Sequence, residues 1–125
     1  MSREIKFRAW KKSESRMVRW YELTDKPDDL VDALLLVKYE AVMQYTGLKD
    51  KAGVEIYEGD IVSYEMADNT SNALVRYDDM AVRFRFVCDP DGFSGYSVHK
   101  EDVVKRVTVI GNIYETPEIL EASTA

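Results

Sequence analysis

The sequence predicts a mainly β protein with a minor helical part, in which an N-terminal β-hairpin and a short helix precede a small β-barrel. Two observations lead to this fold class. Apolar and charged residues alternate along residues 5–10 and 81–87, which is the period of a strand buried on one face. Short apolar segments separated by glycine- and aspartate-rich turns fill the second half, a pattern typical of small barrels.

The chain has 125 residues, of which 46% are hydrophobic, enough for one ordinary domain with its own core. We expect a single domain over residues 1–120, with the hairpin, helix and one strand in 1–45, the barrel in 46–120, and a disordered tail at 121–125. The chain has one cysteine, no apolar leader and no apolar run near the roughly 20 residues that cross a bilayer. These features predict a cytoplasmic protein.

The N-terminal hairpin is predicted from two segments of strand character. In residues 5–10, Ile5, Phe7 and Ala9 alternate with Lys6, Arg8 and Trp10. Residues 17–21 form a second short segment of strand character. A polar turn at residues 11–15 separates them. Two such segments joined by a short polar turn predict an antiparallel pair.

A short helix and a further strand are expected to follow. In residues 24–35, Asp25 is placed to cap a helix and Pro27 fits its first turn. The acidic residues just after the proline favour the positive end of the helix dipole. Residues 37–45 are then expected to be extended and to lead into the second half.

The second half is expected to be a β-meander of short strands. Residues 81–87 show the strictest alternation, with Val82, Phe84 and Phe86 on one face and Arg83 and Arg85 on the other. The other expected strands are residues 60–66, 73–77, 96–98 and 106–113. Closing such strands into a barrel removes exposed sheet edges.

Residues 43–62 contain the most specific signal in the chain. Two extended segments are joined by the polar turn at 49–53, where Gly53 can take the positive φ that a hairpin turn needs. The next strand begins at Asp60. The local sequence Glu58-Gly-Asp-Ile-Val62 is similar to the strand entry of many SH3-like barrels.

With the opening residues 3–10 and the closing residues 109–120, this block resembles the YopX family of small proteins, mostly from phages and prophages of Gram-positive bacteria. The resemblance covers both ends and the centre of the chain. It implies an SH3-like barrel and a phage or prophage accessory protein. It assigns no catalytic or binding role to any residue.

The charge of the chain is distributed unevenly. The net charge is -6, yet residues 1–20 carry seven basic and two acidic side chains, so this segment is +5 and the remainder is -11. A basic hairpin with Trp10, Lys11, Lys12 and Trp20 is suited to nucleic acid, through phosphate contacts and base stacking. Charge alternation on the wet face of a hairpin, with the tryptophans packed beneath, accounts for the same pattern.

Catalytic and metal-binding motifs are scarce. His99 is the one histidine and Cys88 the one cysteine, so the sequence predicts no metal cluster and no cofactor. The carboxylates of Glu55, Glu58 and Asp60 could hold a divalent ion for a hydrolase or nuclease, although solvated turn residues have the same spacing. We expect no catalytic residues and no enzymatic activity.

The tyrosines offer a candidate contact surface. Tyr57, Tyr64 and Tyr77 fall on the expected barrel, and tyrosine provides contact area at protein interfaces with little loss of entropy. Small barrels also fill half-buried rims with tyrosine. The favoured interpretation is a non-enzymatic module that binds a host or phage protein, and the alternative is a nucleic-acid-binding protein that uses the basic hairpin.

Overall fold

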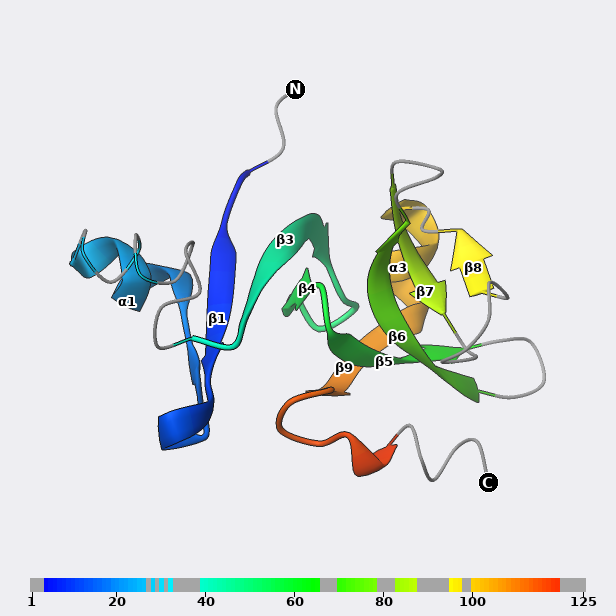
Figure 1. Ribbon diagram of the computed structural model, residues 1–125. Helices are drawn as coiled ribbons and strands as arrows, with labels where there is room; N and C mark the ends of the chain where they lie inside the picture. The colour runs from blue at the N-terminus through cyan, green and yellow to red at the C-terminus, as the bar shows by residue number, and fades with distance from the viewer. Residues whose placement is uncertain are drawn as a thin grey trace. The chain divides into compact units, whose positions relative to one another are not determined.

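The structure is a computed structural model that describes residues 4–26, 28, 30, 32, 39–65, 70–78, 83–87, 95–97 and 100–119. These residues form a mainly β fold with short helices and two antiparallel sheets, which confirms the predicted class (Figure 1). The chain divides into two compact units, Met1–Tyr45 and Thr46–Ala125. Whether the chain folds as one domain stays a prediction.

The first unit is built on the predicted hairpin. Strands β1 (Phe7–Lys11) and β2 (Arg16–Val18) are joined by the 3-10 helix η1 (Lys12–Glu14). Strand β3 (Ala41–Lys49) pairs with the other edge of β1 and continues into the second unit, where β4 (Glu55–Tyr57) completes the order β2-β1-β3-β4. The core cluster of the first unit consists of Ala9, Val18, Leu23 and Tyr39.

The helical part of the first unit differs from the prediction. Helix α1 (Trp20–Asp25) begins directly after β2 and was not predicted, and Asp25 is its last residue, so the expected cap at Asp25 is wrong. The helix begins early because Leu23 is fully buried in the core cluster and Trp20 packs against that cluster. Residues 28, 30 and 32 are helical, as expected, and the rest of the predicted helix after residue 26 lies outside the described residues.

The second unit is a curled five-stranded antiparallel sheet of order β8-β7-β6-β5-β9 (Figure 1). Its strands are β5 (Asp60–Glu65), β6 (Thr70–Asp78), β7 (Arg83–Val87), β8 (Gly95–Ser97) and β9 (Val107–Asn112). The alternation predicted in β7 is confirmed where it is described, since Phe84 and Phe86 are buried and Arg83 is exposed.

Helix α3 (Lys100–Arg106) packs against β5 and β9 and was not predicted. A helix of seven residues is not stable by propensity alone and depends on burying an apolar side chain. Val103 does this, being 1% exposed. The core cluster of the second unit consists of Ile56, Val62, Ala73, Val75, Phe86, Val103 and Val107.

The turn between β3 and β4 lies on the outer edge of β9. The buried Asp50 carboxylate accepts the Ala52 and Val54 N–H groups through Oδ1 and the Val109 N–H through Oδ2, each at 2.9 Å. The Lys51 N–H also donates to the Val107 carbonyl at 2.9 Å. These bonds occupy an edge that would otherwise be open to another strand.

The segment after β9 packs closely on that strand. Asn112 Oδ1 accepts the N–H groups of Tyr114 at 3.0 Å and Glu115 at 2.8 Å, which turns the chain. A Cβ atom placed on Gly111 would lie 2.0 Å from the Thr116 Oγ1 atom, so the returning chain needs glycine there. The predicted tail at 121–125 lies outside the described residues.

Candidate functional site

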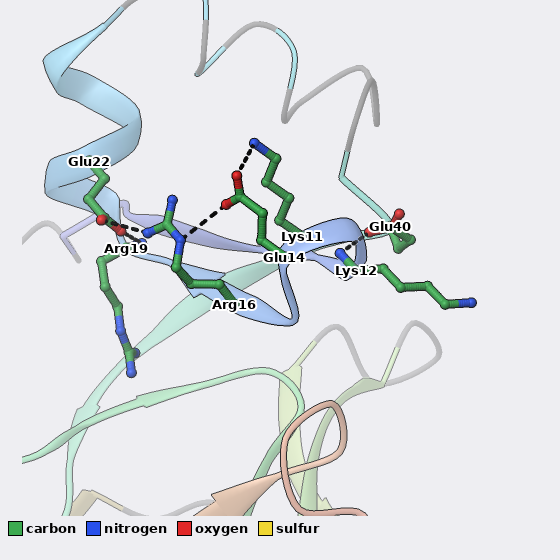
Figure 2. A network of polar contacts seen from close by, with 7 residues as sticks. All are labelled: Lys11, Lys12, Glu14, Arg16, Arg19, Glu22 and Glu40. Atoms are coloured by element: carbon green, nitrogen blue, oxygen red, sulfur yellow. Dashed lines mark hydrogen bonds and ion pairs between the residues drawn. The ribbon is translucent and has the colours of Figure 1, made fainter.

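The basic hairpin carries a network of ion pairs that joins its turn to α1 (Figure 2). Lys11 Nζ lies 3.2 Å from Glu14 Oε1, and Arg16 Nε lies 3.3 Å from Glu14 Oε2. A terminal guanidinium nitrogen of Arg16 lies 2.8 Å from Glu22 Oε1. Arg16 therefore bridges two glutamates, one in η1 and one in α1.

Two further carboxylate oxygens bind backbone N–H groups of the same hairpin. The Arg19 N–H donates to Glu22 Oε2 at 2.8 Å, and the Lys12 N–H donates to Glu40 Oε2 at 2.6 Å. The side chains of Lys12 and Arg19 extend away from these carboxylates in Figure 2. Residues 1–45 contain nine basic and eight acidic side chains, so the +5 of the first 20 residues falls to +1 over the whole first unit.

The network also shifts the ionisation of its members. Hydrogen bonds from Lys11 and then Arg16 lower the pKa of Glu14. The Arg19 backbone N–H, followed by Arg16, lowers the pKa of Glu22, while burial opposes the shift. Hydrogen bonds to Glu22 and Glu14 raise the pKa of Arg16. All three groups are therefore charged at neutral pH.

The two tryptophans of the predicted nucleic-acid surface lie in different surroundings. The Trp20 ring packs against Phe7, with centroids 6.0 Å apart, beside the core cluster of the first unit. Trp10 is half-buried and pairs across the hairpin with Met17. Phe7 and Trp10 point to opposite faces of β1, because they are three positions apart along the strand. The structure does not bring the two indole rings onto one stacking platform.

The three predicted tyrosines differ in exposure. Tyr57 is 5% exposed, and its hydroxyl donates to Glu55 Oε1 at 3.4 Å. Tyr64 is half-buried and meets Phe86 edge-on at 6.3 Å between ring centroids. Tyr77 is 39% exposed and meets Phe84 edge-on at 5.2 Å. Of these three, Tyr77 is the most exposed.

Two of the carboxylates considered for catalysis, those of Asp60 and Glu55, contact Tyr57 just before β5. Asp60 is 1% exposed and accepts the Tyr57 N–H through Oδ2 at 2.8 Å. Glu55 accepts the hydroxyl of the same tyrosine. The described part of the chain contains no group of three histidine, cysteine or acidic residues that could hold a metal ion. Cys88 and His99 lie outside the described residues.

Three arginines on β6 and β7 form a cluster that the sequence analysis missed. Arg76 lies directly opposite Arg85 in the antiparallel pair, and Arg83 lies two residues further along β7. Arg76 and Arg83 are exposed and Arg85 is half-buried. The alternation in β7 placed two of these arginines on one face, but only the strand register adds Arg76.

Comparison with known proteins agrees with this architecture. The model of the YopX protein family matches residues 6–121. The chain belongs to the YopX family. A search of curated proteins found no match. The crystal structure of protein EF1440 from Enterococcus faecalis is similar to this YopX family member, with a TM-score of 0.66 and 27% sequence identity over 95% of this chain and 99% of that one.

None of the helices in the described residues has the length and apolar character needed to cross a membrane.

Proposed function

We propose that this YopX family member is a non-enzymatic binding module: a phage or prophage accessory protein that acts in the host cytoplasm by binding a host or phage protein. The match to the family over residues 6–121 supports an accessory role. The engagement of Glu55 and Asp60 with Tyr57 supports a structural role for the carboxylates that were considered for catalysis.

Tyr77 is the observation that carries the proposal. The residue is 39% exposed, yet the edge-on contact with Phe84 holds its ring in place. A ring that is already fixed loses little entropy on binding, which favours affinity. Exposed arginines at positions 76 and 83 lie on the same pair of strands. Tyrosine and arginine are enriched among the residues that dominate protein interfaces.

The ion pairs of the hairpin weaken the nucleic-acid alternative. Lys11 and Arg16 pair with Glu14, and Arg16 also pairs with Glu22, so part of the positive charge is already neutralised. Phosphate binding would have to break these pairs or rely on the remaining cations.

The proposal is tested by capture of proteins from a host lysate on the tagged full chain, with and without nuclease. Wild type is compared with Tyr77→Ala and with Tyr21→Ala, whose tyrosine is 72% exposed on α1. We expect a nuclease-resistant partner that Tyr77→Ala loses and Tyr21→Ala keeps, with circular dichroism confirming that both variants fold. Recovery that disappears with nuclease, or that is equal in all three proteins, contradicts the proposal.

A further inference from the structure

We propose that the arginine face of β6 and β7, formed by Arg76, Arg83 and Arg85, binds an acidic segment of a partner protein. This inference rests on the proposed binding function and names the chemistry of the partner. The antiparallel register carries it: Arg76 pairs with Arg85, Leu74 with Val87 and Asp78 with Arg83. Residues 76, 78, 83 and 85 therefore share one face of the ladder.

The arginine face lies opposite the core of the second unit. Val75 and Phe86 are cross-strand partners that belong to the core cluster, and their neighbours Arg76 and Arg85 point to the other side of the sheet. Arg76 and Arg83 are exposed there, while Leu74 and Val87, further along the same face, are buried. The charged end of this face is therefore accessible to a partner.

Basic residues gather on this face. Its described residues include three arginines, and Arg76 lies directly opposite Arg85. Like charges directly opposite each other in an antiparallel pair are destabilising. An anion bound at the exposed Arg76 and Arg83 would screen the positive charge of this face. The fold and the anion are therefore expected to stabilise each other.

Arginine is well suited to carboxylates in particular. Its planar guanidinium presents paired N–H donors that match both oxygens of a carboxylate. Guanidinium groups on neighbouring strands can each take one carboxylate of an extended acidic segment.

Overall charge favours an acidic protein segment over nucleic acid. The whole chain is -6, and residues 46–125, which contain the arginine face, carry eight basic and fifteen acidic side chains, a net -7. A nucleic acid presents a long row of phosphates, which the net negative charge of residues 46–125 repels. A short acidic segment can dock on three arginines without extending far beyond them.

The test uses the intact chain and a fluorescein-labelled hexaglutamate peptide, with binding measured by fluorescence anisotropy at low ionic strength. Arg83→Gln is expected to weaken binding about tenfold, the loss of one charged hydrogen-bonding group. Arg76→Glu is expected to weaken binding more than tenfold, because it also adds a carboxylate that repels the peptide. Arg76→Glu also places an opposite charge beside Arg85, so its melting temperature is expected to equal or exceed that of wild type. Lys105→Glu, an exposed charge reversal on α3, is the matched control and is expected to keep binding within about twofold.

The outcomes separate the inference from the function on which it rests. Absence of peptide binding, or equal binding by Arg76→Glu and wild type, overturns the arginine face. So does a single-stranded oligonucleotide of similar charge that binds as tightly as the peptide. If any of these results accompanies a Tyr77-dependent, nuclease-resistant partner, the proposed function stands and only the acidic chemistry of its partner is wrong.

Discussion

Asp50 shows how one buried carboxylate connects two distant segments of the second unit. It accepts the N–H groups of Ala52 and Val54 within its own turn and that of Val109 in β9, each at 2.9 Å. Asp50 is only 3% exposed. Removing the carboxylate leaves three N–H donors without this acceptor in a site with little access to water.

We predict that Asp50→Ala lowers the free energy of unfolding by about 3 kcal/mol, because part of the desolvation cost of each donor is no longer compensated. Asp25→Ala, at the exposed end of α1, is the control and should change it by less than about 0.5 kcal/mol. Urea unfolding followed by circular dichroism measures both. Equal values for the two variants would show that the carboxylate does not hold the turn on β9.

Gly53 and Gly111 are required for different physical reasons. Alanine substitutions distinguish these reasons. Gly53 has a φ of +85° and open space around its Cβ position, so Gly53→Ala is expected to cost about 1 kcal/mol of backbone strain. A Cβ added to Gly111 would lie 2.0 Å from Thr116 Oγ1, so Gly111→Ala must displace the returning chain and is expected to cost about 3 kcal/mol.

Urea unfolding of the two glycine variants checks this order. A larger loss for Gly53→Ala than for Gly111→Ala would mean that the segment after β9 moves aside at little cost. The sequence analysis predicted the positive φ at Gly53 from its turn. It did not predict the contact at Gly111, because that contact depends on Thr116 folding back onto β9.

At the scale of elements, η1 and α1 of the first unit are linked by charges that acid removes. Glu14 and Glu22 have pKa values lowered in the folded state relative to the usual value of 4.5. Their contribution to stability is therefore complete above about pH 4.5 and is lost as the pH falls through the lowered values. The hairpin network should loosen in acid.

We predict that acid lowers the melting temperature of the first unit, and that the double variant Glu14→Gln and Glu22→Gln shows a weaker dependence on pH. Both tryptophans lie in this unit, so tryptophan fluorescence during heating reports on it selectively. Glu101→Gln, an exposed change on α3, is the control and should keep the dependence of wild type. If the melting temperature of the double variant falls in acid as much as that of wild type, the ion-pair network is not the cause of the pH dependence.

The helices show why local sequence predicts strands here better than it predicts helices. Alternation of Phe84 and Phe86 with arginines is a local signal, and the strand was correctly expected. Helices α1 and α3 have six and seven residues, too few for a periodic pattern to stand out. Burial of Leu23 and Val103 stabilises them, and that burial exists only once the sheets have formed.

At the scale of the whole molecule, the distribution of charge weighs against nucleic acid as the partner. The net charge is -6, and the first unit is only +1 once the six acidic and two basic residues of 21–45 are counted. Nucleic-acid binders depend on an extended positive surface that releases counterions on binding. The folded molecule therefore lacks the long-range attraction that the first 20 residues alone indicated.

We predict no binding of single-stranded DNA at about 150 mM salt, and no change when Lys11 and Lys12 are both replaced by glutamate. An electrophoretic mobility assay at several salt concentrations measures this. Binding that falls steeply with salt and disappears in the double variant would favour the nucleic-acid alternative over the protein-binding proposal.

The sequence by itself determined the mainly β class, the N-terminal hairpin, the turn at Gly53 and the family, because each depends on alternation, turn residues or motifs that are local along the chain. Tertiary structure alone decided the burial of Tyr57, the separate surroundings of Trp10 and Trp20, and the register that sets Arg76 opposite Arg85. These features depend on which strands pair and which faces pack. Such contacts join residues far apart in sequence, so no local pattern encodes them.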